Sequence, residues 1–265
     1  MFSLADTHCH LDFDAFDGDR DEVISRARDA GVVRMLNPGI DLSSSSKALR
    51  LAEMYEEVFV ACGVHPNDAL SWDGETEQTL RQMVNHPKVV AIGEIGLDYY
   101  RDRAPRDLQK QILVKQLALA AEAVLPVVIH NRQAAEDTLD LLSAWYIDLV
   151  ISGSRLAAQP GVLHSFSGDQ EVATRAIAMN FMIGITGPIT YRNADDLRNI
   201  VSSIPLSALL IETDAPFLTP QPRRGERNEP VYVAWVAEKI AELHYLPVKE
   251  AMEQTTANSY KLFHW

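Results

Sequence analysis

Six histidines and carboxylates of this sequence each stand at the end of an apolar run, and their types suit the binding of a divalent metal. They are His8 and His10 in the segment Asp6-Thr7-His8-Cys9-His10, followed by Glu94, His130, His164 and Asp214. Imidazole nitrogens and carboxylate oxygens are common ligands of Zn²⁺ and related cations. An isolated pair of histidines two residues apart carries little weight by itself. Six such residues at the ends of predicted strands favour a metal site built inside a barrel.

The elements that must hold these side chains alternate short β-branched runs with longer amphipathic segments, which is typical of βα units. We predict strands near residues 2–7, 32–37, 58–64, 89–94, 126–130, 162–165, 181–186 and 208–213. We predict helices near residues 19–30, 43–56, 75–85, 105–124, 133–146, 169–179, 194–203, 231–243 and 248–263. The ambiguous stretch 148–160 is interpreted as a helix end and an extended loop. This α/β pattern over 265 residues predicts one domain, residues 1–265, folded as a TIM (β/α)8 barrel of parallel strands with outer helices.

The composition is that of an ordinary globular protein, and it limits the partners. Thirty-seven acidic and 24 basic residues give a formal charge of -13, which disfavours a protein that coats long nucleic acids. An enzyme that binds a few nucleotides at the end of a nucleic-acid strand remains compatible with this charge. No basic stretch or long apolar run follows Met1, so we expect a cytoplasmic protein without membrane contact. Two cysteines, Cys9 and Cys62, imply no disulfide framework.

Strand geometry predicts which of the candidate side chains point together. Side chains two residues apart on a strand face the same side, so His8 and His10 should converge, as should Glu212 and Asp214. A carboxylate such as Glu94 is costly to bury unless a cation or hydrogen-bond donors compensate its charge. The strand pattern therefore favours a shared, buried site for these side chains.

The remaining candidates are expected around the same end of the barrel. His130 and His164 end the fifth and sixth predicted strands, which places them side by side. Glu212 should lie one layer deeper than Asp214 and orient a ligand histidine through the free N–H of its ring. Asp98 is interpreted as a residue that supports the site or fixes its loop.

Four residues in the neighbouring loops are candidates for substrate binding: His65, Arg132, Arg224 and Asn228. Guanidinium groups beside a metal site suit a bidentate anion such as phosphate. Taken alone, an arginine of this kind is more often a solvated surface charge. We predict that these side chains line the entrance to the metal site.

In their order along the chain, several motifs resemble those of the TatD family of metal-dependent hydrolases. They are Asp6-Thr7-His8-Cys9-His10, Gly63-Val64-His65-Pro66, Gly93-Glu94-Ile95-Gly96-Leu97-Asp98-Tyr99, His130-Asn131-Arg132, His164-Ser165-Phe166-Ser167-Gly168, Glu212-Thr213-Asp214-Ala215-Pro216-Phe217-Leu218, Arg224-Gly225 and Asn228-Glu229-Pro230. Two departures are small. Ser165 stands where the family often has Cys, and the loop around residues 147–160 is longer than usual.

The resemblance implies an amidohydrolase-like TIM barrel and a two-metal site bridged by Glu94. In that pattern His8, His10 and Asp214 complete one metal site, and His130 and His164 complete the other. The resemblance also implies a deoxyribonuclease, commonly a 3′-to-5′ exonuclease acting on single strands with Mg²⁺, Mn²⁺ or Zn²⁺. The substrate would be a short or single-stranded DNA end, with no obligate protein partner.

The catalytic hypothesis assigns Asp214 as the acceptor of a water proton, with Glu94 as the bridge between two metals. The imidazole-rich ligand set favours Zn²⁺ or another late transition metal, because Mg²⁺ prefers oxygen ligands. One alternative is an amidohydrolase or esterase on the same scaffold, although its nearest version carries a modified Lys where this chain has Glu94. A second alternative is a metal-dependent binding protein without turnover.

Overall fold

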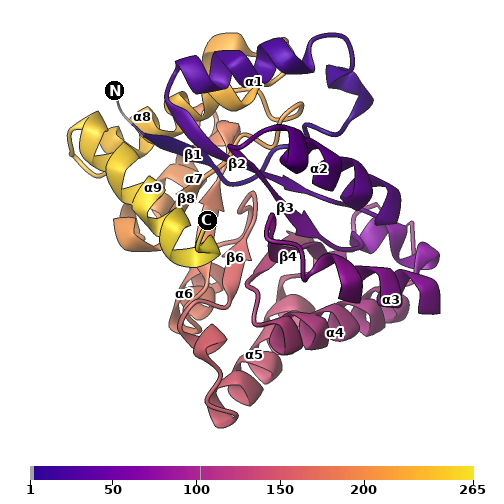
Figure 1. Ribbon diagram of the computed structural model, residues 1–265. Helices are drawn as coiled ribbons and strands as arrows, with labels where there is room; N and C mark the ends of the chain where they lie inside the picture. The colour runs from indigo at the N-terminus through magenta and orange to yellow at the C-terminus, as the bar shows by residue number, and fades with distance from the viewer. Residues whose placement is uncertain (1–2, 102) are drawn as a thin grey trace.

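A computed structural model describes residues 3–101 and 103–265 and contains eight strands in one parallel sheet, in chain order (Figure 1). The strands are β1 (Leu4–Asp6), β2 (Val32–Pro38), β3 (Val58–Cys62), β4 (Val89–Asp98), β5 (Val127–Arg132), β6 (Gly161–Leu163), β7 (Met182–Ile185) and β8 (Leu209–Ile211). Each strand pairs in parallel with the next. This order is that of a TIM barrel, which confirms the predicted fold class.

The barrel closes where β8 meets β1, through backbone contacts just beyond the two strands. The amide of Thr7 donates to the Ile211 carbonyl at 3.1 Å, and the amide of Asp214 donates to the His8 carbonyl at 2.8 Å. Cys9 and Ala215 then form an isolated parallel bridge. These contacts fasten together the two chain segments that carry His8 and Asp214.

Helices surround the barrel and connect successive strands (Figure 1). They are α1 (Arg20–Asp29), α2 (Leu42–Met54), α3 (Gly74–Met83), α4 (Arg106–Ala123), α5 (Ala135–Ile151), α6 (Gln170–Ala178), α7 (Asp195–Ser203), α8 (Val233–Leu243) and α9 (Val248–Phe263). Asp41, Asp73 and Asp169 cap α2, α3 and α6, because each carboxylate accepts a hydrogen bond from a backbone amide of the first turn. Within the described part of the chain, we find no helix with the length and apolar character to cross a membrane.

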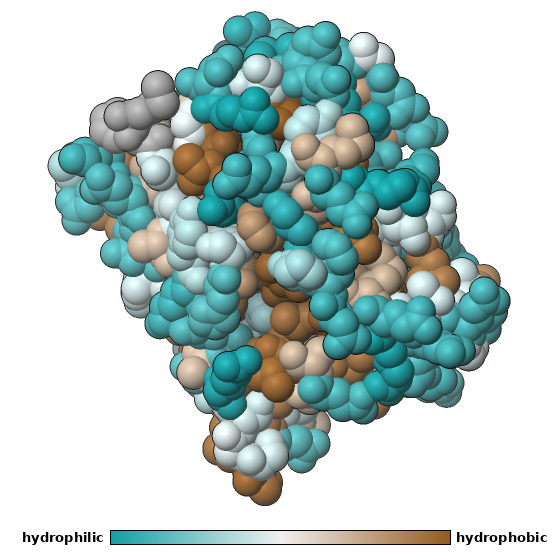
Figure 2. Space-filling view, in the orientation of Figure 1, coloured by the Kyte–Doolittle hydropathy of each residue, from teal (hydrophilic) through white to brown (hydrophobic). Residues whose placement is uncertain are grey.

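Alternation along the strands separates two apolar layers. Met35, Val127 and Ile129 pack in the large cluster between strands and helices, whereas Leu36 and Val128 belong to a second cluster. The second cluster also contains Ala61, Val90, Ala91, Val162, Met182, Leu210, Leu262 and Phe263. It is the barrel interior at the amino end of the strands, and the end of α9 covers it. The face that carries the C-terminus is mostly hydrophilic, with a band of apolar residues through its middle (Figure 2).

The predicted elements are all present, and their bounds shift by a few residues. β1 begins at Leu4, and residue 2 of the predicted strand 2–7 lies outside the described residues. β4 is longer than predicted and continues past Glu94 to Asp98. In the ambiguous stretch, α5 runs on to Ile151, and a 3-10 turn over Arg155–Ala158 replaces the extended loop. The assignment of residues 1–265 to one domain stays a prediction.

Candidate metal centre

Four side chains with atoms that can bind a metal ion meet at the carboxyl end of the barrel. The Nε2 atoms of His8 and His10 lie 3.2 Å apart. Oε2 of Glu94 lies 3.4 Å and 3.8 Å from these nitrogens, and Oδ1 of Asp214 lies 3.7 Å and 3.6 Å from them. Tetrahedral ligands 2.0–2.2 Å from Zn²⁺ are separated by about 3.3–3.6 Å. These five separations are therefore close to those around a tetrahedral ion, and the ligand atoms of His8, His10 and Glu94 all lie within 4.8 Å of one another.

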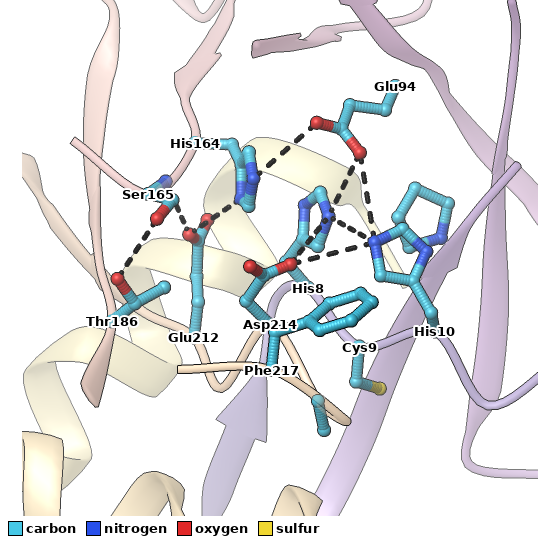
Figure 3. Close-up of polar contacts among 12 residues, drawn as sticks. His8, Cys9, His10, Glu94, His164, Ser165, Thr186, Glu212, Asp214 and Phe217 are labelled. Carbon is cyan, nitrogen blue, oxygen red and sulfur yellow. Dashed lines mark hydrogen bonds and ion pairs between the residues drawn. The ribbon is translucent and has the colours of Figure 1, made fainter. Parts of the chain in front are cut away.

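The second oxygen of Glu94 faces a different group of histidines. Oε1 lies 2.8 Å from Nδ1 of His130, 3.5 Å from Nε2 of His164 and 3.6 Å from Nε2 of His65. His65, Glu94 and His130 offer ligand atoms within 4.8 Å of one another. In Figure 3 the Glu94 carboxylate points down between His8, His10 and His164. The carboxylate thus stands between two sets of imidazoles, as a bridging ligand would.

Strand alternation brings some of these side chains inward, and loop geometry brings the others. His130 lies on β5 two residues after the interior residue Val128, and His164 follows the interior residue Val162 of β6 by the same step. His8, His10 and Asp214 lie beyond β1 and β8. Asp214 has a left-handed backbone with φ 56°, a conformation that Asp tolerates better than most residues. Its inward position comes from this turn rather than from strand alternation.

Glu212 fixes the orientation of His164. Its Oε2 lies 3.1 Å from His164 Nδ1 and accepts a hydrogen bond of 2.9 Å from the Ser165 amide (Figure 3). With Nδ1 held in this way, Nε2 of His164 is the atom presented to Glu94. The neighbouring strand β7 carries Gly184, where a Cβ would lie 2.2 Å from Oε1 of Glu212. A glycine at this position leaves the space that the carboxylate occupies.

Asp98 performs a similar task for His130 and also holds the loop after β4. Its Oδ2 lies 3.3 Å from His130 Nε2 and accepts a hydrogen bond of 3.1 Å from the Asn67 amide group. Its Oδ1 accepts the backbone amides of Tyr100 and Arg101, each at 2.9 Å. One carboxylate therefore ties together the loops after β3 and β4 and the histidine on β5.

A buried pair, Asp6 and Thr213, joins the two segments that supply His8 and Asp214. Asp6 accepts hydrogen bonds from the Thr213 hydroxyl at 2.6 Å, the Thr213 amide at 2.9 Å and the His8 amide at 3.3 Å. Burial raises the pKa of Asp6 to about 7, against the effect of these hydrogen bonds. The sequence places Asp6 in the first motif, but only the closed barrel reveals its partner 207 residues away.

The charges of the centre favour carboxylates in the ionised form. Burial alone would raise the pKa of Glu94, but the imidazoles of His164 and His65 outweigh it and hold this pKa well below its usual value. Burial also opposes ionisation of Asp214, and the hydrogen bond and charges of the nearby histidines lower its pKa nevertheless. Burial disfavours protonation of His164, yet the charges of Glu94 and Glu212 raise its pKa to about 9. Buried anions among imidazoles are the donor set that a divalent cation needs.

Residues 5–264 match the sequence profile of the family described as TatD related DNase. The chain belongs to the TatD family. It is 43% identical over 260 residues to YabD of Bacillus subtilis, named an uncharacterized metal-dependent hydrolase, with 98% of both chains covered. It is 38% identical over 266 residues to an Erwinia tasmaniensis protein named 3′-5′ ssDNA/RNA exonuclease TatD, covering 98% of this chain and 99% of that one.

A solved TatD structure shares the whole fold. The crystal structure of YjjV, a TatD homologue from Escherichia coli, superposes with a TM-score of 0.90 at 33% identity, covering 99% of this chain and 98% of the other. Membership of the TatD family makes this protein a metal-dependent hydrolase. The candidate metal centre is the part of the molecule with the chemistry for that activity.

Outside the centre, this TatD-family protein places the four predicted substrate-binding residues in different ways. His65 lies among the candidate ligands, as described above. The Arg132 guanidinium stacks on the Tyr100 ring, and that of Arg224 stacks on Tyr191, each 4.0 Å from the ring centroid.

The prediction for Asn228 is wrong as far as the entrance is concerned. The side chain is fully buried, and its amide group donates to the carbonyls of Thr213 at 2.8 Å and Phe217 at 2.6 Å. Its oxygen accepts the Glu229 amide at 2.9 Å. Because these bonds occupy both donors and the oxygen, Asn228 holds the loop that carries Asp214 and does not face a substrate.

Proposed function

We propose that this protein is a two-metal deoxyribonuclease that shortens single-stranded DNA from its 3′ end. The observation that carries the proposal is the position of Glu94, whose two oxygens face two separate groups of imidazoles. A carboxylate in that place is suited to bridge two cations. The names of relatives such as the Erwinia exonuclease support the substrate class.

The residues fit two divalent cations of the zinc type. His8, His10 and Asp214 would hold one ion with Glu94, and His130 and His164 would hold the other with the same carboxylate. Nitrogen-rich donor sets of this kind suit Zn²⁺ better than Mg²⁺. Paired cations in such a site lower the pKa of a water molecule and neutralise the charge of a phosphodiester.

Asp214 is the proton acceptor in this proposal. Its Oδ1 faces the histidine nitrogens, and its side chain is 15% exposed against 5% for Glu94, so it reaches nearer to the entrance. Its lowered pKa keeps the carboxylate ionised at neutral pH and ready to accept a proton from the attacking water.

Arg132 and Arg224 hold the substrate phosphates in this proposal. Stacking on Tyr100 and Tyr191 fixes the plane of each guanidinium and leaves its N–H edge for an anion. The overall charge of -13 agrees with binding of a few nucleotides at the end of a DNA strand rather than of a long duplex.

The test combines metal analysis with cleavage of 5′-labelled single-stranded oligonucleotides by wild type and the Asp214→Asn variant. We expect metal-dependent shortening from the 3′ end by wild type and a loss of about 10²–10⁴-fold in Asp214→Asn, with most of the bound metal retained. Asp196→Asn changes an exposed carboxylate on α7 and should behave as wild type. Retained activity in Asp214→Asn would remove Asp214 as the base. Hydrolysis of carboxyl esters but not of oligonucleotides would favour an esterase on the same scaffold.

A further inference from the structure

A groove of about 430 Å³ adjoins the metal centre. Its lining is aromatic and mostly acidic, in contrast to the part of the entrance that carries Arg132 and Arg224. It lies between the loops that follow β1, β2 and β8. Two aromatic rings and four charged side chains define it: Phe13, Phe217, Asp12, Asp14, Asp41 and Lys47. Clefts of this size accept small organic molecules.

The aromatic wall of the groove is joined directly to a candidate metal ligand. The Phe13 ring stacks on the His10 ring with 4.5 Å between centroids and 18° between planes. The Phe217 ring meets Phe13 edge to face at 6.1 Å and lies 6.5 Å from His10. Figure 3 shows the Phe217 ring beside Asp214 and His10. A group that rests on these rings therefore lies next to the reacting centre.

Phe217 is 52% exposed although it is large and apolar. It follows Asp214 by three residues, and its carbonyl is fixed by the buried amide group of Asn228 at 2.6 Å. The ring is thus held on an anchored loop while about half of the residue remains exposed to solvent. An anchored aromatic ring of this kind is a surface on which another flat ring can stack.

The charges around the groove exclude a phosphate and favour a neutral ring. Asp12, Asp14 and Asp41 outnumber Lys47, and Lys47 lies 3.5 Å from Asp14. Asp12 uses both oxygens within the protein, accepting from Asn37 and Ser44 at 2.8 Å each. An anionic phosphate would be repelled here, whereas a nucleobase has a π-face for Phe217 and no charge.

We propose that the groove receives a nucleobase next to the scissile phosphate, stacked on Phe217, while the phosphate itself occupies the metal centre. This inference rests on the proposed nuclease function and names the part of the substrate that the acidic side of the entrance recognises. Every base presents a π-face, so the groove selects for the presence of a base and not for its identity. Phe217 is a positioning residue, because it holds the substrate beside the centre without touching the reacting atoms.

The experiment compares the first 3′ cleavage of two single-stranded oligonucleotides, one ordinary and one whose last two nucleotides lack their bases. We expect wild type to cleave the ordinary end with a kcat/KM about 5- to 100-fold higher. In Phe217→Ala this ratio should fall towards one, mainly through a higher KM for the ordinary end. Phe217→Tyr keeps the ring and should restore the preference. Tyr245→Asn removes an exposed aromatic residue in the turn between α8 and α9 and should keep the wild-type ratio.

Three outcomes would overturn the inference. The first is equal cleavage of both ends by wild type. The second is a Phe217→Ala variant that cleaves both ends more slowly by the same factor and holds less metal, which would make Phe217 a structural support. Cleavage of neither oligonucleotide by metal-loaded wild type would instead reject the nuclease function, and the groove proposal would fall with it. Metal content and circular dichroism of each variant distinguish these cases.

Discussion

The two ends of the barrel bury residues of opposite kinds along the same strands. At the amino end the interior is apolar and closed by α9, with Phe263 3% exposed and its ring 4.8 Å from that of Trp265. At the carboxyl end the interior consists of imidazoles and carboxylates that are almost as deeply buried. Three strands show the change within two residues: Val128 and His130, Val162 and His164, Leu210 and Glu212.

This contrast shows how a barrel separates stability from chemistry. Apolar side chains at the amino end lose water without leaving polar groups unsatisfied, so they stabilise the fold. Polar side chains one layer further up lose water at a cost and lower that cost only through hydrogen bonds or a bound cation. A substitution at the carboxyl end should therefore alter activity and metal binding. A substitution at the amino end should alter the free energy of unfolding.

The largest expected effect is the loss of activity in Glu94→Gln. The neutral amide cannot supply two anionic oxygens to the surrounding histidines, so bound metal and metal-dependent hydrolysis should both fall to background. Elemental analysis and an oligonucleotide assay measure the two quantities. Glu57→Gln is the matched control, because Glu57 is also a buried glutamate but pairs with Arg28 near the amino end. Wild-type metal content in Glu94→Gln would contradict the assignment.

Phe263→Ala should produce the opposite result. Removal of a buried phenyl ring from the cover of the barrel interior should lower the free energy of unfolding by about 3–5 kcal/mol. Activity and metal content per folded molecule should stay at the wild-type level, because Phe263 lies at the far end of the strands. Urea unfolding followed by circular dichroism gives the first quantity. A loss of activity larger than the unfolded fraction would show that the two ends are coupled.

Glu212→Gln should have an intermediate effect confined to the carboxyl end. His164 and the Ser165 amide both contact the same oxygen of Glu212, which the Gln oxygen can replace, but the neutral Gln carries no charge to support the ring. We expect metal affinity or kcat/KM to fall about 10- to 100-fold, with a smaller change in stability. Metal titration and steady-state kinetics measure it. Values within twofold of wild type would mean that His164 needs no such support.

The sequence predicts the strand-borne part of the centre well, because strand alternation is a local rule. Val128 and His130 share a face simply because they are two residues apart on β5. The same rule is insufficient for Asp214, which lies beyond β8 and turns inward through its left-handed backbone. The prediction of six candidate ligands does not depend on this rule alone, because the loops that follow the strands of a barrel gather at its carboxyl end.

Contacts between loops are the part that the sequence does not reveal. His65 follows β3 and reaches Glu94 only because the intervening turn places it there. Asn228 follows an arginine-rich exposed turn, and nothing in its neighbours along the chain indicates that it is fully buried. Its partners, Thr213 and Phe217, lie 15 and 11 residues earlier. Such pairings depend on how the loops close over one another, which follows from the complete fold.

The smallest predicted effect concerns Asp73, a residue that caps an outer helix and takes no part in the metal centre. Asp73 caps α3 outside the barrel, and its Oδ1 accepts the Thr76 amide at 2.8 Å and the Thr76 hydroxyl at 2.9 Å. These hydrogen bonds lower the pKa of Asp73 below 3.8. The carboxylate therefore stabilises the fold above that pH, and its contribution is lost as the pH falls through the lower folded-state pKa. Asp73→Ala should unfold at a slightly lower urea concentration at neutral pH, with unchanged activity.

The difference in urea midpoint between wild type and Asp73→Ala should narrow as the pH is lowered below 3.8, through the depressed pKa of the folded state. Asp73→Asn separates the two contributions, since Asn is as good a helix cap as Asp and does not titrate. That variant should stay close to wild type at neutral pH. A difference for Asp73→Ala that does not change with pH would assign the whole effect to cap geometry, and a loss of activity would show that the outer helices at this end also shape the centre.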